Sequence, residues 1–420
     1  MSPLTAILIG AGARGAGCYA PYALKYPHEL KFIAVAEPNR ERREAFAEAH
    51  GIPAKNRYES WEELLANPQL ADIALITTQD RQHYEPTLRA LKQKYHVLLE
   101  KPMSPDPAEC LEMERAAKEN YRLLTICHVL RYTPFWSKLK AIIAEGKIGE
   151  VISVQLNENV GYWHMAHSFV RGNWSHSAVS SPMILAKSCH DMDVLSWLVD
   201  QPCERVSSFG SLKHFRPDQA PEGAADRCLD CRVQGECPYA APRFYLSDTY
   251  RHWARHFAPE LTEAQIIQGL RDTDYGRCVY KSDNDVVDHQ VVNMEFANGA
   301  TAMFSMCAFT MNSERRIQIM GTRGELRGEE NKIIWWDFLS GEKMEITIPV
   351  PSSGHGGGDE GVVDSFVKEV RGYDGQESLT SASASVRSHM MAFAAEHSRV
   401  NGGKVVDLAA FAGELNVPVR

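Results

Sequence analysis

Short apolar runs alternate with amphipathic segments along the first 130 residues of the chain. The apolar runs are nearly continuous, which is typical of strands buried on both faces of a parallel sheet. The segments between them carry charges at helical spacing, which predicts helices that cover the sheet. The predicted strands are Thr5–Ile9, Leu30–Ala36, Ala71–Thr77, His96–Glu100 and Arg122–Cys127, and the predicted helices are Arg40–His50, Trp61–Ala66, Tyr84–Gln93 and Pro107–Glu119.

The pattern changes after a boundary near residues 128–134. Alternating segments surround Asn298-Gly299, a pair that favours a two-residue hairpin turn, and further alternating segments extend a largely antiparallel sheet. The predicted strands are Val287–Phe296, Ala300–Phe309, Arg315–Met320, Lys332–Trp336 and Met344–Val350, followed by helices Val362–Val370 and Ala382–His397, which we expect to pack back on the first domain.

The predicted fold class is therefore α/β with two domains. Residues 1–130 form a parallel sheet that is covered by helices, and residues 131–420 form an α+β domain with a mostly antiparallel sheet. A loop-rich insertion that contains cysteines lies near residues 205–285.

A glycine-rich turn ends the first predicted strand as Gly10-Ala-Gly12-Ala-Arg-Gly15. Between a strand and a helix, this spacing predicts a dinucleotide-binding turn whose backbone approaches a pyrophosphate. Glu37 ends the second strand, where a carboxylate accepts hydrogen bonds from an adenosine ribose. That favours NAD over NADP, because a carboxylate repels a 2′-phosphate. Three arginines just beyond it weaken this preference: Arg40, Arg42 and Arg43.

Composition narrows the class of protein. The 420 residues suffice for two or three domains, and 44% hydrophobic with 24% charged residues is typical of a globular protein with a large core. The net charge of −9 argues against electrostatic binding to nucleic acid or to an anionic membrane. We expect no transmembrane helix, and the apolar start is typical of a buried strand rather than a signal peptide. The ten cysteines indicate reduced thiols, so we expect a cytoplasmic protein.

Several motifs together resemble the glucose–fructose oxidoreductase / inositol dehydrogenase / MocA (Gfo/Idh/MocA) family. The resemblance implies NAD(P)-dependent chemistry on sugars, cyclitols or related polyols, with residues 1–130 as a Rossmann domain that binds NAD(P). It implies that residues 131–420 are a substrate-binding domain with a large, open sheet, which often mediates homo-oligomers, as dimers or tetramers. The motifs are the glycine turn, Glu37-Pro38, Thr78 with His83, Glu100-Lys101-Pro102-Met103, Ile148-Gly149-Glu150 and residues 182–199.

The resemblance also implies cofactor contacts. Lys101 follows the strand that we predict at His96–Glu100, and ligands of open α/β sheets bind beyond the carboxyl ends of the strands. In the family this lysine contacts both nicotinamide and substrate, and its bond to the next proline is often cis. The expected cofactor contacts are Gly10, Gly12, Ala13, Arg14, Gly15, Glu37, Arg40, Thr77, Thr78, Gln79, His83, Glu100, Lys101 and His128.

A buried helix predicted over residues 183–199 carries the candidate acid–base group. Lys187, His190 and Asp193 recur at helical spacing, so that one face of the helix can present all three. His190 matches the histidine of the family motif, whereas Ala186 stands where the family usually has an aspartate. A site without that carboxylate would better tolerate an anionic substrate, such as a uronate.

These residue types fit the oxidation of a secondary alcohol. A histidine can take up the alcohol proton near neutral pH, and a nearby lysine can stabilise the developing alkoxide. We therefore expect His190 to be the acid–base, and Lys101 and Lys187 to polarise the reacting oxygen.

An aromatic and polar loop follows a strand predicted at Ile152–Leu156. Rings stack on sugar faces, polar groups bind hydroxyls, and Arg171 could bind a carboxylate, although a packed structural loop would show the same residues. The predicted substrate-binding residues are Arg131, Tyr162, Trp163, Arg171, Trp174, His289 and His355, the last in the glycine-rich segment Ser353–Asp359.

The insertion brings three cysteines close together, as Cys228-x2-Cys231-x5-Cys237, and Cys278 is a candidate fourth. Four thiolates would suit a structural zinc ion, but strong zinc signatures show two C-x2-C pairs. Free thiols and an iron–sulfur centre are the alternatives.

Together these patterns predict an oxidoreductase that transfers a hydride between NAD(P) and a secondary alcohol of a sugar, uronate or cyclitol. Two alternatives stay open: a redox-neutral, NAD-dependent glycosidase of the same family, and a non-catalytic, NAD-dependent sensor or regulator. The presence of both Lys101 and His190 favours an enzyme.

Overall fold

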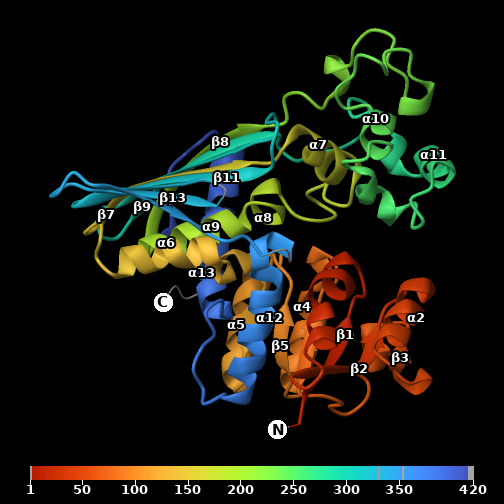
Figure 1. Cartoon of the computed structure of the whole chain (residues 1–420), viewed down its shortest axis with the longest axis horizontal. Helices are drawn as coiled ribbons and strands as arrows, with labels where there is room; N and C mark the ends of the chain where they lie inside the picture. Colours follow the sequence, from red (N-terminus) through yellow and green to blue (C-terminus); the bar gives the residue numbers. More distant parts are fainter. Residues whose placement is uncertain (1, 330, 352–353, 415–420) are drawn as a thin grey trace.

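A six-stranded parallel sheet forms the first domain of the computed structural model, which describes residues 2–329, 331–351 and 354–414 (Figure 1). The strand order β3-β2-β1-β4-β5-β6 reverses between β1 and β4, which is where an open α/β sheet binds its ligand. The strands are β1 (Leu4–Ile9), β2 (Leu30–Ala36), β3 (Arg57–Tyr58), β4 (Ile73–Ile76), β5 (His96–Leu99) and β6 (Leu124–Ile126).

Helical segments cover both faces of this sheet. All five predicted strands and all four predicted helices are confirmed, with shifts at their ends, whereas the two-residue strand β3 is too short to show a pattern. The segments are η1 (Ala13–Tyr19), α1 (Pro21–Lys25), α2 (Arg40–Ala49), η2 (Ala54–Asn56), α3 (Trp61–Leu64), η3 (Asp80–Gln82), α4 (Tyr84–Lys92), α5 (Pro107–Asn120) and η4 (Val129–Tyr132).

A nine-stranded sheet forms the second domain, in the order β14-β13-β12-β11-β7-β10-β9-β8-β15. Only the pair of β7 with β10 is parallel among the pairings that the described residues show, so the prediction of a mostly antiparallel sheet is confirmed. The strands are β7 (Val151–Asn159), β8 (Cys203–Ser211), β9 (His289–Phe296), β10 (Thr301–Cys307), β11 (Glu314–Gly321), β12 (Gly324–Glu329), β13 (Lys332–Asp337), β14 (Lys343–Thr347) and β15 (Val406–Asp407).

Helices lie along one face of the nine-stranded sheet and leave the other face open (Figure 1). The helix predicted over residues 183–199 is in fact two, α8 and α9, because the backbone of Ser188 leaves the helical conformation. Helix α12 packs its apolar side against the first sheet, as predicted for the last helices. The helices are α6 (Pro134–Ala144), α7 (Tyr162–His164), η5 (Met165–Arg171), α8 (Met183–Ala186), α9 (Cys189–Val199), η10 (Gly354–Gly357), α12 (Gly358–Arg371), α13 (Ala382–Val400) and α14 (Leu408–Glu414).

The loop-rich insertion lies between β8 and β9 and projects from one end of the sheet (Figure 1). It has only a small apolar core of its own, built around Tyr245, Ile266 and Leu270. The short helices of the insertion are η6 (Pro217–Gln219), η7 (Cys228–Asp230), α10 (Ala241–Tyr245), η8 (Arg251–His256), α11 (Glu263–Asp272) and η9 (Asp274–Gly276).

Within the described residues, no helix has the length and apolar character needed to cross a bilayer.

Candidate active site

The glycine turn after β1 is tightly packed on one side and open on the other. Gly10 has φ +91°, and a Cβ there would lie 2.8 Å from the Thr77 carbonyl oxygen, so only glycine fits. A Cβ on Gly15 would lie 2.5 Å from the Gly10 carbonyl oxygen, which the Thr77 hydroxyl also binds at 2.6 Å. By contrast, a Cβ on Gly12 would meet nothing within 4 Å. This open backbone is where the turn can receive a pyrophosphate.

Glu37 lies at the end of β2 with its carboxylate directed at the glycine turn. It is buried and accepts hydrogen bonds from the backbone N–H groups of Ala11 and Asn39, at 2.8 and 2.9 Å. Of the neighbouring arginines, Arg42 pairs with this carboxylate at 3.0 Å, and Arg43 binds the Glu37 carbonyl oxygen. The Glu37 carboxylate is thus held in place beside the turn, as a ribose-binding carboxylate requires.

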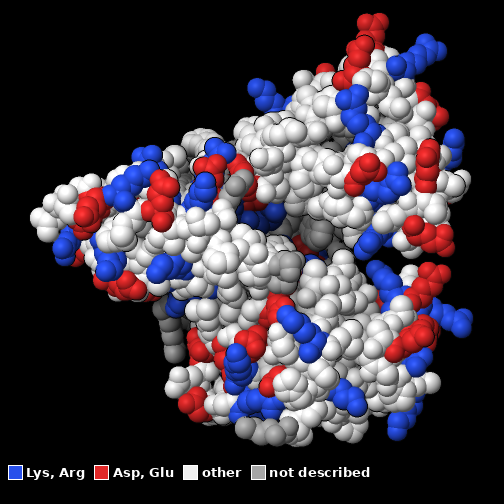
Figure 2. Space-filling model, viewed as in Figure 1, with Lys and Arg blue, Asp and Glu red and all other residues white. Residues whose placement is uncertain are grey.

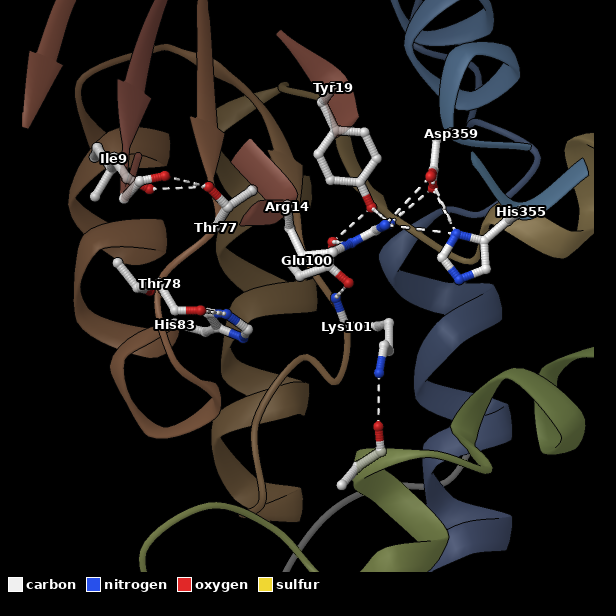
Figure 3. Close-up of polar contacts among 12 residues, drawn as sticks. Ile9, Arg14, Tyr19, Thr77, Thr78, His83, Glu100, Lys101, His355 and Asp359 are labelled. Atoms are coloured by element: carbon white, nitrogen blue, oxygen red, sulfur yellow. Dashed lines mark hydrogen bonds and ion pairs between the residues drawn. The ribbon is translucent and has the colours of Figure 1, made fainter. Parts of the chain in front are cut away.

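Arg14 connects the glycine turn to β5 and to α12 (Figure 3). Its guanidinium lies 3.1 Å from the Glu100 carboxylate and 2.8 Å from that of Asp359, and Tyr19 donates to Glu100 at 2.5 Å. Asp359 also binds His355 Nδ1 at 3.0 Å, and this ring and Arg14 hold the pKa of Asp359 below its ordinary value against the effect of burial. The Arg14 side chain is therefore committed to carboxylates of the chain rather than free for a phosphate.

Lys101 extends from the end of β5 toward the second domain, where its Nζ donates to the Ala186 carbonyl oxygen at 2.6 Å (Figure 3). The Lys101–Pro102 peptide bond is cis. The turn is held from both domains: His83 Nδ1 lies 2.7 Å from the Pro102 carbonyl oxygen, and His389 on α13 accepts from the Met103 N–H at 3.0 Å. No carboxylate lies within ion-pair distance of the Lys101 ammonium in the described part of the chain.

His190 lies in the first turn of α9, close to this lysine. The ring is buried, and its Nδ1 has no hydrogen-bond partner among the described residues. The His128 ring centre lies 5.7 Å away and the His355 ring centre 6.2 Å away. Burial, followed by the nearby charge of Lys101, holds the pKa of His190 well below its ordinary value. A neutral imidazole at physiological pH can accept a proton, which is what a general base does.

Lys187 has a carboxylate partner that comes from another element. Its Nζ lies 3.2 Å from Glu158 on β7, and Arg315 on β11 bridges Glu158, at 2.8 Å, and Asp191, at 2.7 Å. Burial raises the pKa of Asp191 to about 6, although Arg315 opposes this. Glu158 thus places a negative charge beside Lys187, a partner that the sequence did not predict.

Two family models match most of the chain. The model of an oxidoreductase family with an NAD-binding Rossmann fold matches residues 4–128, and that of its C-terminal alpha/beta domain matches residues 140–406. The chain belongs to the Gfo/Idh/MocA family. It is therefore an NAD(P)-dependent oxidoreductase that binds its cofactor through the Rossmann domain.

Relatives and solved structures agree with this membership. The oxidoreductase YteT of Bacillus subtilis (strain 168) is 26% identical over 79% of this chain and 80% of its own length. Levoglucosan dehydrogenase, solved with NADH and levoglucosan, has a TM-score of 0.72, with 18% identity over 97% of this chain and 100% of its own. Aldose-aldose oxidoreductase from Caulobacter crescentus has a TM-score of 0.67, with 16% identity over 96% of this chain and 99% of its own. The two structures share the fold.

Three predicted site residues of this family member are bound elsewhere. Arg131 is buried and binds Asp193 through two nitrogens, at 2.8 and 2.6 Å, so that neither residue faces a substrate. Arg171 is also buried and donates to the carbonyl oxygens of Arg277 and Tyr239, not to a substrate carboxylate. Trp174 donates to Asp80 at 3.3 Å, a contact between the two domains.

The remaining predicted residues differ in how near the site they lie. His355 contacts both Arg14 and Asp359 (Figure 3), and its ring centre lies 6.2 Å from that of His190. Ser353 of the same segment lies outside the described residues. Tyr162 and Trp163 are half-buried on α7. His289 binds its neighbour Asp288 at 2.7 Å. Of the remaining cofactor candidates, Arg40 and Gln79 make no side-chain hydrogen bond to the residues that the structure describes, Ala13 begins η1, and Thr78 donates to the Gln82 carbonyl oxygen.

The four cysteines proposed as metal ligands border one small cavity of the insertion: Cys228, Cys231, Cys237 and Cys278. In the part of the chain that the structure describes, no three His, Cys, Asp or Glu side chains are placed to hold one metal ion, so the zinc expectation is not supported.

Sequence reasoning missed several groups that shape the site. Glu158 and Arg315 lie on strands and show only the ordinary alternation of polar and apolar positions. His389 is one of many polar residues on a long helix. No local motif marks them, because their partners are far away in the sequence.

Figure 2 shows the surface hollowed between the two lobes, with charged side chains around the hollow.

Proposed function

We propose that the protein transfers a hydride between NAD and a secondary alcohol of a sugar, uronate or cyclitol. One observation carries this proposal: Lys101 of the first domain reaches the segment just before His190 of the second, where its Nζ binds the Ala186 carbonyl oxygen at 2.6 Å. An ammonium and a neutral buried imidazole on either side of a domain boundary suit the oxidation of an alcohol.

The residues divide the chemistry between them. Bound nicotinamide accepts or supplies the hydride. His190 takes the proton of the alcohol hydroxyl during oxidation and returns it during reduction. Lys101 stabilises the negative charge that develops on the same oxygen, and Lys187, held by Glu158, adds a second ammonium near it. The buried environment keeps His190 neutral until it accepts that proton.

The cofactor preferred by this site is NAD. The Glu37 carboxylate is buried and fixed by two backbone N–H groups, so it stays in place beside the glycine turn. It would bind the two hydroxyls of an adenosine ribose and repel a 2′-phosphate. Arg42 partly offsets this charge, but it is itself paired to Glu37.

A substrate panel tests the proposal. The protein is incubated with NAD and with neutral sugars, uronates, cyclitols and aryl glycosides, and NADH absorbance and glycoside cleavage are followed together. Net NADH formation with a sugar, uronate or cyclitol supports the proposal. Cleavage without net NADH assigns the redox-neutral glycosidase instead, and binding without either reaction assigns the sensor. Lys101→Met serves as a control, since it should abolish a true turnover but not an artefact.

The open face of the nine-stranded sheet is the surface on which we expect a second copy. Phe209, Val291 and Met303 share this face on adjacent strands and are 55%, 38% and 42% exposed. Sedimentation analysis of the protein, and of a Phe209→Glu variant, tests this expectation. A monomer at all concentrations would overturn it.

A further inference from the structure

His190 is buried, so a proton that it takes from an alcohol needs a route to solvent. The need for this route rests on the proposed function, because each net oxidation of an alcohol by NAD releases one proton besides the hydride. His190 is only 6% exposed, and its Nδ1 has no hydrogen-bond partner among the described residues. A base that takes up a proton in one turnover must lose it before the next. The neighbours of His190 therefore decide how the proton leaves.

Four side chains act on the His190 ring through their charge: Lys101, His128, Arg315 and His355. Lys101 and Arg315 carry positive charge and offer no lone pair to a proton. An imidazole, by contrast, can take up and release a proton near neutral pH. The two candidates are therefore His128 and His355, whose ring centres lie 5.7 and 6.2 Å from that of His190.

These two histidines lead in opposite directions from His190. His128 is fully buried, and so is His389, the other histidine ring beside it. The side chain of His355, by contrast, is 41% exposed. Its ring centre is too far from that of His190 for a direct bond between ring nitrogens, but one water with two hydrogen bonds of about 2.9 Å each can bridge them. His355 is thus the neighbour from which a proton can reach solvent.

Asp359 and Arg14 hold the His355 ring in a defined state (Figure 3). Asp359 accepts a hydrogen bond from His355 Nδ1 at 3.0 Å, and Arg14 pairs with the same carboxylate at 2.8 Å. Because an ionised carboxylate can only accept, the proton of the neutral ring lies on Nδ1, and Nε2 is the nitrogen that can take up a second one. The carboxylate then stabilises the imidazolium that forms.

The backbone at His355 has an uncommon conformation. Its φ is +50°, in the left-handed region that a residue with a Cβ seldom adopts. Such a conformation persists where the surroundings hold it, and it is found most often at functional sites. The hydrogen bond to Asp359 fixes the side chain that this backbone presents.

We propose that His355 carries protons between His190 and solvent during the reaction. In the oxidation, the O–H bond of the alcohol breaks and its proton goes to His190, while the hydride goes from the alcohol carbon to the bound nicotinamide. His190 then passes a proton through a bridging water to Nε2 of His355, and His355 gives one to solvent. Alcohol and NAD⁺ thus become ketone, NADH and one proton, and both rings are neutral again. The reduction runs the same path in reverse.

Chemical rescue tests this relay. The full-length protein, His355→Ala and His355→Gln are assayed with NAD and the best substrate of the panel, in dilute buffer and with either imidazole or pyrazole added. Imidazole can carry the proton, whereas pyrazole has a ring of the same size but is a far weaker base. In dilute buffer both variants should lose about tenfold or more of kcat, and imidazole, but not pyrazole, should restore most of it. The control is His28→Ala, at an exposed position of the first domain, which should keep its full rate.

The outcomes separate a relay from a structural role. A loss that neither ring restores, or that both restore equally, would mean that His355 only holds the fold or fills space. An unchanged rate of both variants in dilute buffer would show that the proton leaves by another route. Each of these results overturns the proposal.

A measurement without turnover separates this proposal from the proposed function. In nitrogen NMR of the protein at alkaline pH, the His355 signals are identified by their loss in His355→Gln. Nδ1 of His355 should carry the proton and Nε2 should not, and the reverse would overturn the relay even if the substrate panel succeeds. If no member of the panel is oxidised, the proposed function fails, while the NMR result still shows whether His355 has the ring state that a relay needs.

Discussion

The two sides of the candidate site hold their charged side chains in different ways. On the cofactor side, Arg14 faces two carboxylates, Glu100 and Asp359. On the substrate side, Lys187 and Arg315 balance Glu158 and Asp191. Lys101 lies between the two networks without an ion-pair partner among the described residues, so it is the cation that developing negative charge would meet.

The comparison teaches how each half fixes its geometry. The cofactor side is organised by the turn after β1, by strand ends that follow one another in the sequence, and by Asp359 of α12, which binds Arg14. The substrate side is organised by pairs that join a helix to two strands of the sheet. Damage on the substrate side should therefore spread to the fold, because its two buried carboxylates share one arginine, Arg315.

Replacing the proposed base should have the largest effect. His190→Ala should lower kcat by about 10²–10⁴-fold, because proton transfer then falls to water, while the affinity for NAD stays nearly unchanged. Steady-state kinetics and a fluorescence titration with NADH check both statements. The matched control is His397→Ala, at an exposed position of α13, which should behave as the unmodified protein. Near-normal turnover of His190→Ala would refute the assignment.

Removing the shared carboxylate should have the next largest effect. Glu158→Gln leaves Lys187 without its partner and weakens Arg315, so we expect unfolding to become easier by about 3–5 kcal/mol. Chemical denaturation measures this change, and kinetics at a temperature where the variant is folded measure the fall in kcat/KM.

A matched pair of variants sharpens this test. Adding Lys187→Met to Glu158→Gln removes both partners of one pair, so part of the lost stability should return. A double variant that is as unstable as the sum of the two single variants would mean that Glu158 and Lys187 do not interact.

The sequence predicted the first domain better than the second for a physical reason. Continuous apolar strands and the glycine spacing are local signals, so β1, β2 and the turn between β1 and η1 could be located from them. Glu158 could not be predicted, because its role depends on β7 lying beside β11, a pairing between residues far apart in the chain. Arg171 shows the reverse error: its chemistry suits a substrate carboxylate, yet the fold buries it beside Cys228.

On the cofactor side, a change of charge without a change of shape should have a smaller effect. Glu37→Gln keeps an acceptor for the Ala11 N–H but removes the negative charge that disfavours a 2′-phosphate. The ratio of kcat/KM with NAD to that with NADP should fall by about tenfold, a change of about 1.4 kcal/mol. Lys55→Gln, which removes an exposed charge of the same domain without touching this carboxylate, is the control. An unchanged ratio for Glu37→Gln would show that Glu37 does not select the cofactor.

The smallest expected effect is that of mild acid on the oxidation rate. A histidine with an ordinary pKa near 6.5 would be mostly protonated at pH 5.5, and the rate would fall by about tenfold. The groups that face His190 are Lys101, His128, Arg315 and His355. Burial is the main cause that lowers the pKa of His190, and the positive charge of Lys101 lowers it further. His190 should thus stay neutral at pH 5.5, and kcat/KM should fall by less than about twofold between pH 7.5 and 5.5. Circular dichroism at each pH confirms that the protein is folded. A limb centred near pH 6.5 would show instead that solvent and substrate reach the ring more freely than its burial implies.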